Sequence, residues 1–413
     1  MNSPAKKIPT LPKPNRREFL RATGAATAGV MLPSQFALAA EPTRKKIRMG
    51  VVGGNFGNAF FWHEHPDCVV EAVSDLIPAR RERLMKTYKC SKSYESLEKL
   101  ILDKNIDAVA IFTPAPDHVR HITATLKAGK HAICAVPAAQ TLEDCQLLIE
   151  TVKQTGLTYM MAETGYYQQA TISARKFYKE GQFGKLFYVE SEYMHPGIEA
   201  LYFENGKPTW RHGSPAMLYP THCTSHLISV SGERLTEVTC QGWGDDDPAH
   251  KNNVYNNPFW NEIGFFKTNR GNSMRIANFR KGAVKGAERA QYYGDKMSFF
   301  FNNPIGLGAT IVRAGTQKEK DDGGFTRAAA EAEPYEVPKW WSADLLPKPL
   351  RHDSGHSGSH TFITHEFIDS LVNGRKPTVN VYEAVAYTAP GIVAHDSSMK
   401  GGERLKIPSF DPT

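Results

Sequence analysis

The chain has 413 residues, enough for two domains that each bury a core. Hydrophobic residues make up 41% and charged residues 23%, which is typical of a globular protein and excludes a largely disordered or fibrous chain. The net charge of +7 lies mainly before residue 40, and because the remainder is nearly neutral, no nucleic-acid partner is expected.

The first element in chain order, residues 1–40, is predicted to be a targeting signal. Arg16-Arg17 precede a short, weakly apolar run over Ala22–Leu32, and Ala37-Leu38-Ala39 offers the small residues that a signal peptidase requires. The run is too short for a permanent membrane anchor. The pattern resembles a twin-arginine signal, which predicts export to the periplasm or another extracytoplasmic compartment. A disordered basic tail is the alternative.

Residues 45–163 alternate short apolar strands with helices, a pattern that predicts a parallel, doubly wound α/β sheet. The strands are short and unbroken, as expected when both faces of a sheet are covered. Strands are predicted at Lys46–Val52, Val69–Val73, Ala108–Phe112, His131–Ala135 and Thr158–Met161. Helices are predicted after the turn Gly53–Gly57 and at Ala79–Tyr88, Tyr94–Leu102, His118–Ala128 and Leu142–Thr155.

Residues 164–413 predict a second, α+β domain with an open, mostly antiparallel sheet. Strands are expected at Leu186–Tyr193, Leu235–Gly242, Glu262–Thr268 and Ser273–Phe279, and helices at Thr361–Leu371 and Tyr382–Met399. The polar segment 315–358 is predicted to be a long loop, either over the active site or on the surface. None of the six cysteines forms a CxxC pair, so buried free thiols and no metal site are expected.

The glycine-rich turn after the first strand predicts a dinucleotide site. Gly53, Gly54 and Gly57 let backbone amides approach a pyrophosphate, although Asn55 takes the place of the second glycine of the usual GxGxxG spacing. A tight turn without a ligand is the alternative interpretation.

Asp75 follows the second strand, 22 residues after Gly53. A carboxylate there accepts hydrogen bonds from a ribose diol and repels a 2′-phosphate, which favours NAD over NADP. Arg80 and Arg81 leave NADP open, since either could reach a 2′-phosphate.

Several further motifs complete a family pattern: Thr113-Pro114 with His118, Ala128–His131, Pro137, Gly181 with Gly184, Trp210-Arg211 and Asn373–Pro377. From Ile47 onward the chain resembles the Gfo/Idh/MocA oxidoreductases. The resemblance implies a C-terminal sheet facing the nicotinamide, a carbohydrate or cyclitol substrate and a homo-oligomer. It also implies the cofactor-binding residues Gly53, Gly54, Asn55, Phe56, Gly57, Asp75, Thr113, Pro114, His118 and Pro137.

The chain departs from that family at its catalytic positions. Family members carry Glu-Lys-Pro where this chain has Ala135-Val136-Pro137, and Val136 cannot bind or polarise a reacting oxygen as that lysine does. His226 falls at the family's catalytic histidine, and His222 replaces an aspartate. Two histidines at i and i+4 share a helical face and suit general acid–base work near neutral pH. A packing or capping role is the alternative for each.

One branch of the family is more similar. Tyr219-Pro220-Thr221-His222 resembles a segment of the NAD-dependent glycosidases of glycoside hydrolase family 109, and Glu163 with Tyr167 and Gly355-His356 match that branch too. Those enzymes oxidise a sugar, eliminate the aglycone and reduce the product again. Ala135 and Gln168 depart from the branch. The predicted catalytic residues are therefore His222, His226, Tyr167 and Tyr219.

Export limits the chemistry, because little free NAD(H) is available outside the cytoplasm. A tightly bound cofactor that ends each cycle as it began is expected, which favours redox-neutral turnover. The leading hypothesis is a sugar oxidoreductase, and the alternative is an NAD-dependent glycosidase or lyase. A non-catalytic binding protein is the third reading, supported only by the loss of the lysine at Val136.

Overall fold

The computed structural model describes residues 46–244, 247–320 and 322–412. The predicted signal segment lies outside these residues. Within them, no helix is long and apolar enough to cross a membrane.

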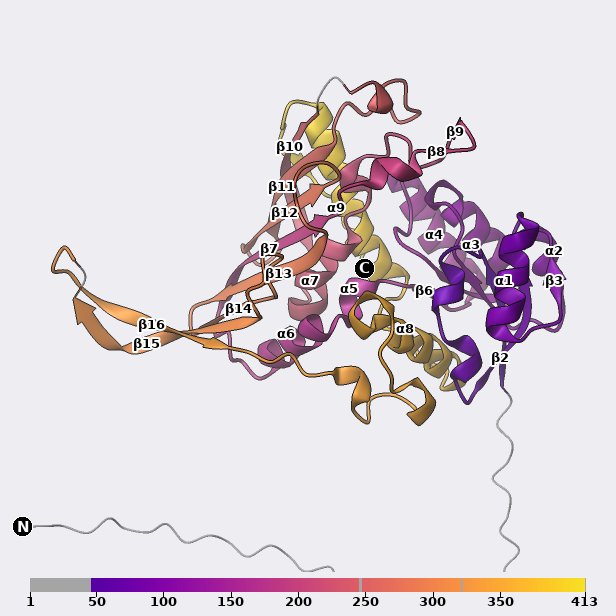
Figure 1. The fold of residues 1–413 in the computed structure, drawn as a ribbon, viewed down its shortest axis with the longest axis horizontal. Coiled ribbons are helices and arrows are strands. Elements are labelled where there is room, and N and C mark those ends of the chain that lie inside the picture. Colours follow the sequence, from indigo (N-terminus) through magenta and orange to yellow (C-terminus); the bar gives the residue numbers. More distant parts are fainter. Residues whose placement is uncertain (1–45, 245–246, 321, 413) are drawn as a thin grey trace, which may run out of the picture. The chain divides into compact units, whose positions relative to one another are not determined.

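The first sheet contains six parallel strands in the order β3-β2-β1-β4-β5-β6 (Figure 1). Its strands are β1 (Ile47–Val52), β2 (Cys68–Ser74), β3 (Ser93–Tyr94), β4 (Ala108–Ile111), β5 (His131–Cys134) and β6 (Tyr159–Met161). All four residues of β4 are buried, because helices cover both faces of the sheet. The strand order reverses between β1 and β4, which opens a ligand crevice at the carboxyl ends of these strands. The predicted doubly wound sheet is confirmed.

The helices of this half are α1 (Pro78–Tyr88), α2 (Leu97–Leu100), α3 (His118–Lys127) and α4 (Leu142–Thr155). The predicted helix over Tyr94–Leu102 was too long. Tyr94 belongs to a short edge strand, and the helix starts only after Ser96, whose side chain accepts a hydrogen bond from the Lys99 backbone N–H.

The predicted α-helix after the glycine-rich turn was wrong. Two 3-10 turns, at Gly57–Ala59 and Trp62–Glu64, lead directly into β2. Only about ten residues separate Gly57 from β2, and Phe60 and Trp62 within them are fully buried. The segment is therefore occupied by core aromatics and has no room for a helix of ordinary length.

A helix from the far end of the chain covers this face of the sheet instead. It is α8 (Gly355–Val372), whose buried side chains Phe362, Ile363 and Phe367 share one apolar cluster with Met49 and Val51 of β1. On the opposite face, α9 (Val381–Met399) packs beside α3 and α4. The C-terminal segment therefore completes both layers of the nucleotide-binding half.

The second sheet has nine strands, in the order β16-β15-β14-β13-β7-β12-β11-β10-β17. Every pair is antiparallel except β7 with β12, so the predicted open, mostly antiparallel sheet is confirmed. Its strands are β7 (Leu186–Met194), β10 (Leu235–Trp243), β11 (Asn261–Thr268), β12 (Ser273–Phe279), β13 (Ala287–Gly294), β14 (Met297–Phe300), β15 (Thr310–Lys320), β16 (Thr326–Pro334) and β17 (Leu405–Lys406). A separate small hairpin joins β8 (Phe203–Glu204) to β9 (Lys207–Pro208).

Helices α6 (Gln169–Lys179), α7 (Thr221–Ser231) and the end of α9 cover one face of this sheet, and the short α5 (Thr164–Tyr167) follows β6.

The predicted loop over 315–358 was wrong in its first part. Strands β15 and β16 pair as a hairpin, which extends away from the rest of the sheet (Figure 1). The remainder continues through 3-10 turns at Trp340–Ser342 and Lys348–Leu350. All six cysteines are buried and form no disulfide.

Candidate functional site

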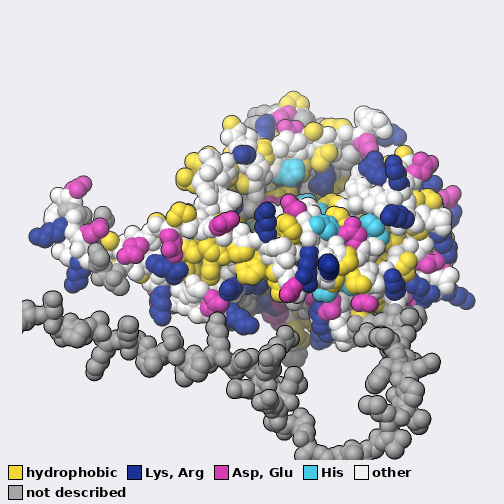
Figure 2. All heavy atoms as spheres, turned by 60° about the horizontal axis from the view of Figure 1, so that its bottom comes forward, with side chains coloured by type: hydrophobic (Ala, Val, Ile, Leu, Met, Phe, Trp, Pro, Cys, Tyr) yellow, Lys and Arg dark blue, Asp and Glu magenta, His cyan; other side chains and the backbone are white. Residues whose placement is uncertain are grey.

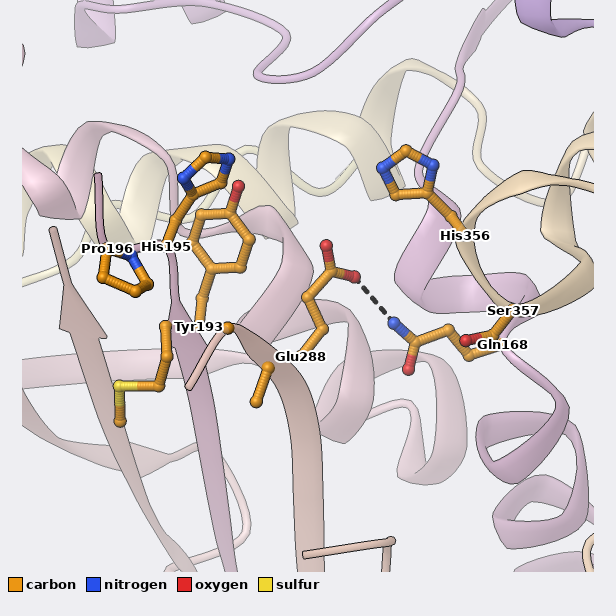
Figure 3. A pocket seen from close by; sticks show the side chains of 10 residues that line it. Gln168, Tyr193, His195, Pro196, Glu288, His356 and Ser357 are labelled. Carbon is orange, nitrogen blue, oxygen red and sulfur yellow. Dashed lines mark hydrogen bonds between the residues drawn. The ribbon is translucent and has the colours of Figure 1, made fainter. Parts of the chain in front are cut away.

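A cavity of about 460 Å³ opens beside the second sheet. Its walls come from β7 and the residues that follow it, from β13, and from the start of both α6 and α8 (Figure 3). The lining residues are Gln168, Tyr193, Met194, His195, Pro196, Gly286, Ala287, Glu288, His356 and Ser357. Histidine side chains also reach the surface together on one face of the molecule (Figure 2).

Histidine side chains and a carboxylate face one another across this cavity. In Figure 3, His195 and Tyr193 lie on one side, His356 lies on the other, and Glu288 lies between them. The Gln168 side-chain N–H donates to Glu288 Oε2 at 2.7 Å, which fixes that carboxylate. Burial lowers the pKa of His356, so its imidazole is neutral at pH 7 and can accept a proton.

His222 lies directly behind the cavity wall. It sits on α7, with its ring 4.9 Å from that of Tyr193 and 5.3 Å from that of Tyr219. Its Nδ1 donates to Oε1 of the fully buried Glu163 at 2.9 Å. Its Nε2 has no partner among the described residues and, unlike the Nε2 of His226, is not sealed from solvent. His222 therefore keeps one ring nitrogen that is free to bond with a ligand.

This pair is an ion pair at neutral pH. Burial alone lowers the pKa of His222, but the carboxylates of Glu163 and Glu288 together raise it to about 9. Burial likewise opposes ionisation of Glu163, yet the imidazolium and the hydrogen bonds it accepts hold the pKa of that carboxyl below its usual value. His222 is therefore a proton donor in the resting protein.

The pair predicts a pH dependence of stability. The pKa of His222 in the folded protein, about 9, lies above its ordinary value of 6.5. Its stabilising contribution is therefore fully present below about pH 6.5 and is lost as the pH rises through about 9. We expect the melting temperature to fall over this range by more in the wild type than in Glu163→Gln/His222→Gln. Parallel profiles of the two proteins would contradict the ion pair.

The other predicted catalytic residues lie in different surroundings. His226 is fully buried in the core of the second domain, where its Nδ1 is 2.8 Å from Ser191 Oγ, and it does not line the cavity. The Tyr167 hydroxyl is 2.7 Å from Thr378 Oγ1, and its ring stacks on Phe362. Tyr219 lies beside His222, so the structure brings these two rings together, whereas Tyr167 and His226 are bonded to other side chains.

The predicted cofactor residues gather at the carboxyl ends of β1, β2, β4 and β5. Gly53 has a φ of +97°, and a Cβ atom there would lie 2.2 Å from the carbonyl oxygen of Phe112. The adjoining Asn55 is exposed, and the ring of Phe56 packs 5.5 Å from that of His356. The glycine-rich turn thus contacts His356, one of the residues that line the cavity.

Asp75 lies at the end of β2 with a carboxylate that fits a ribose diol. The backbone N–H of Gly54 donates to its Oδ2 at 2.6 Å, and that of Ile77 to its Oδ1 at 2.8 Å. No lysine or arginine of the described residues pairs with this carboxylate. Arg80 instead pairs with Glu204, and Arg81 donates to the Asp75 backbone carbonyl. The residues present therefore fit NAD, with its adenosine ribose at Asp75.

His118 holds together two loops at the edge of the sheet where the cofactor residues gather. Its Nδ1 lies 2.7 Å from the carbonyl oxygen of Pro137 and its Nε2 lies 2.9 Å from that of Thr113. It thereby joins the loops that follow β4 and β5. Pro114, beside Thr113, is exposed at the same edge of the sheet.

We expect tighter binding of NAD(H) than of NADP(H), because an unpaired carboxylate beside a 2′-phosphate costs electrostatic energy at short range. Titration of both reduced cofactors into stripped protein measures the ratio. The Asp75→Asn variant should reduce the ratio of the NADPH to the NADH dissociation constant roughly 10-fold. The Glu204→Gln variant, which releases Arg80 from its ion pair, should also strengthen NADPH binding. Tighter NADPH binding by the wild type would show that Arg80 or Arg81 dominates.

Sequence reasoning did not select Tyr193, His195 or Glu288. They lie on or just after strands of the second sheet, where no local motif marks them. His356 and Glu163 were noticed only as family matches. The one signal that could have identified Glu163 is its place two residues after the end of β6, at the edge where the crevice opens.

A reversed strand order, a glycine turn after β1 and a carboxylate after β2 are typical of a dinucleotide-binding domain. Residues 47–163 match the profile of GFO_IDH_MocA, described as an oxidoreductase family with an NAD-binding Rossmann fold. This segment of the chain is therefore similar to the NAD-binding domain of that family.

Curated relatives extend the similarity over most of the chain. A glycosyl hydrolase family 109 protein of Solibacter usitatus is 24% identical over 399 residues, which span 88% of each chain. One of Shewanella pealeana is 25% identical over 451 aligned positions, 96% of each. Among solved structures, levoglucosan dehydrogenase with NADH and L-sorbose has a TM-score of 0.72 at 18% identity, covering 89% of this chain and 100% of that one. Scyllo-inositol dehydrogenase of Lactobacillus casei, with NAD(H) and scyllo-inositol, has a TM-score of 0.64 at 14% identity, covering 88% and 99%.

Proposed function

We propose that the protein is an exported NAD-dependent oxidoreductase that acts on a sugar or sugar derivative, keeps its cofactor tightly bound and turns over without net redox change. The observation that carries this proposal is the ion pair of His222 with Glu163 behind a polar cavity. His222 in this pair supplies the proton-transfer group that the apolar side chain of Val136 does not. The glycosidase and dehydrogenase names of the similar proteins support a carbohydrate substrate.

NAD, when bound, accepts a hydride from a carbon atom and returns one. The residues of this chain handle the oxygen on that carbon. His222 donates a hydrogen bond from Nε2 and holds or passes the proton there. Glu163 is a positioning residue that keeps Nδ1 protonated, and the rings of Tyr193 and Tyr219 flank the imidazole and exclude water.

The second candidate is an NAD-dependent glycosidase or lyase. The family 109 relatives favour it, and so does a second set of proton-transfer groups in the cavity, His356 with Glu288. Elimination next to a ketone requires a base for the neighbouring C–H and an acid for the leaving oxygen. His356 lines the cavity and has a lowered pKa, whereas the Tyr167 hydroxyl is bonded to Thr378.

One experiment separates these candidates. Protein purified without added cofactor is denatured and the released nucleotide is identified by mass spectrometry, with NAD as the expected result. The same protein is assayed with aryl glycosides and with free sugars. Aglycone release at constant NAD redox state indicates the glycosidase, and coupled oxidation and reduction of free sugars indicates the oxidoreductase. Absence of both activities and of nucleotide would favour a binding protein.

Export is proposed to depend on the arginine pair. We expect Arg16→Lys/Arg17→Lys, which keeps the charge, to leave the precursor in the cytoplasm, while the wild type is recovered outside it with a mature start near Ala40. Cell fractionation with N-terminal sequencing measures both. Lys6→Arg/Lys7→Arg serves as the control, and unchanged export of the arginine-pair variant would refute the twin-arginine route.

We also propose that the protein is a homo-oligomer through the outer face of its nine-stranded sheet. Phe265 is exposed there, beside the ion pairs of Arg275 with Glu190 and Glu192.

A further inference from the structure

Two histidines at the start of α8 form a hydrogen-bonded pair. Nδ1 of His356 lies 2.9 Å from Nε2 of His360, and Nδ1 of His360 lies 2.9 Å from the carbonyl oxygen of Ala59. His360 is buried, whereas His356 lines the cavity. Ala59 ends the 3-10 turn Gly57–Ala59, which follows the glycine-rich turn. A chain of two hydrogen bonds therefore joins the nucleotide-binding domain to the cavity.

The carbonyl group at one end determines the direction of both hydrogen bonds. A carbonyl oxygen can only accept, so the Nδ1 atom of His360 carries a proton. Burial lowers the pKa of His360 to about 4, so this ring is neutral at pH 7 and its Nε2 has a lone pair. His356 therefore donates from Nδ1 to that lone pair. Because partial burial also lowers the pKa of His356, its ring has one proton at pH 7, and Nε2 is left with the lone pair.

This Nε2 atom is available to a ligand in the cavity. His356 is exposed to solvent, and its Nε2 forms no hydrogen bond with a described residue. In Figure 3 its ring extends from the start of α8 into the cavity, opposite His195. The charged and titratable groups that act on the ring from other elements are Glu288 of β13, His222 of α7 and Glu163 after β6.

The backbone around His356 has an unfavourable conformation. His356, Ser357 and Gly358 have φ angles of +51°, +56° and +80°. Non-glycine residues rarely adopt this left-handed region, and two in succession are rarer still. Such strain persists where the surrounding structure holds it, and it is concentrated at functional sites. Here the strained turn is the segment that carries the His356 ring into the cavity.

The ring of His360 is held firmly in place by its neighbours. Phe60 stacks on it with the ring centroids 4.6 Å apart, and Phe56 of the glycine-rich turn meets it edge-on at 5.6 Å. A Cβ atom at Gly355 would lie 2.4 Å from Cε1 of His360, so the turn lies directly against this ring. The acceptor for His356 is therefore fixed before a substrate binds.

We propose that His360 is a positioning residue that keeps the ring proton of His356 on Nδ1, so that Nε2 of His356 accepts a proton from the bound substrate. The imidazolium that forms keeps its Nδ1–H bond to His360. The inference rests on the proposed function for the reaction that this proton transfer serves. The position of the proton in the resting protein does not depend on which sugar is used.

The first test needs no substrate. Long-range ¹H–¹⁵N correlation spectra of the NAD-loaded, ¹⁵N-histidine-labelled protein distinguish the two neutral forms of each ring, and His356→Gln identifies the signals of His356 by their loss. We expect the wild-type His356 to carry its proton on Nδ1. A His356 that carries it on Nε2 would overturn the inference whatever the reaction is, and even if every His360 variant failed to fold.

Two variants of His360 extend this test. His360→Phe keeps an aromatic ring against Phe60 but has no lone pair, so the His356 proton should move to Nε2, the form that free histidine favours in water. His360→Gln has an N–H for the Ala59 carbonyl and an oxygen for His356, so it should keep the proton on Nδ1. An unchanged proton position in His360→Phe would overturn the positioning role.

The same helix offers a matched control. Nδ1 of His365 lies 3.1 Å from Nε2 of His65, so α8 carries a second histidine pair, and neither member of it is among the residues that line the cavity. His365→Phe also breaks a histidine pair on α8. It should leave the spectrum of His356 and the turnover unchanged.

The second test measures kinetics on the substrate that the protein turns over. We expect His360→Phe to lower kcat roughly 10-fold or more while NADH affinity stays at the wild-type value, and His360→Gln to recover most of the loss. The acidic limb of the kcat/KM profile should move to lower pH in His360→Phe. The reason is that the Nδ1–H bond to His360 stabilises the charged ring more than the neutral one, so losing it lowers the pKa of His356.

The outcomes separate this inference from the proposed function. Full turnover of His360→Phe with an unmoved acidic limb would overturn the inference and leave the proposed function standing. A wild-type protein with the His356 proton on Nδ1, but without turnover of any sugar or glycoside, would contradict the proposed function and leave the positioning role of His360 in place.

Discussion

Replacing His222 by alanine is expected to lower turnover roughly 10²- to 10⁴-fold, the usual contribution of a positioned proton-transfer group. Val136 offers no alternative donor, and His226 is sealed in the core behind Ser191. Bound NAD should be retained, because the glycine turn and Asp75 belong to other elements. Single-turnover rates and released nucleotide are measured together, so that loss of chemistry is distinguished from loss of cofactor.

The alanine variant leaves Glu163 buried without its partner, which costs about 3–5 kcal/mol. Glu163→Gln/His222→Gln removes both charges and is the variant that decides the question. It should fold with near wild-type stability and show the same loss of turnover. His226→Ala is the comparator and should lower stability more than turnover. Full activity of the double variant on the true substrate would remove His222 from the mechanism.

Replacing Gly53 by alanine is expected to abolish NAD binding and destabilise the protein strongly. The positive φ alone costs a non-glycine residue about 1–2 kcal/mol. The added Cβ would also lie 2.2 Å from the Phe112 carbonyl oxygen, so β1 and β4 must separate at the switch point. We expect at least a 10-fold loss of NADH affinity by fluorescence titration and a clear drop in melting temperature.

Gly129→Ala is the matched control for this change. Gly129 also has a positive φ, of +78°, but no atom lies within 4 Å of the position its Cβ would take. The Gly129→Ala variant should lose only the stability that the positive φ costs a non-glycine residue, and it should bind NADH normally. Equal effects of the two variants would show that the close approach at Gly53 is unimportant.

Local sequence patterns were sufficient to predict most of the helices and strands of the nucleotide-binding domain. The unbroken apolar run Ala108–Phe112 predicted β4 within one residue, and Leu142–Thr155 predicted α4 at both ends. The helix after Gly57 was predicted from the usual strand–turn–helix order. It is absent because Phe60 and Trp62 are core residues, and the helix that replaces it comes from about 300 residues later in the chain. No local sequence pattern predicts a contact between residues so far apart in the chain.

The candidate site was predictable only in part for a related reason. His222 and His226 are both on α7, where ten of eleven residues are buried, so two histidines one turn apart meet different surroundings. The i and i+4 spacing could not distinguish the one that pairs with Glu163 from the one that pairs with Ser191. The position of Glu288 depends on strand register in the second sheet, which long-range pairing determines.

The covering of β1 by α8 has a consequence for biosynthesis. At about 5–20 residues per second, roughly 15–60 s separate the emergence of β1 from that of α8. During this interval Met49, Val51 and Trp62 lack the side chains of α8 and are covered only in part by α1, so the nascent sheet exposes an aggregation-prone apolar face. Emergence of α8 is therefore the event that allows this domain to close, and chaperones would be needed most before it.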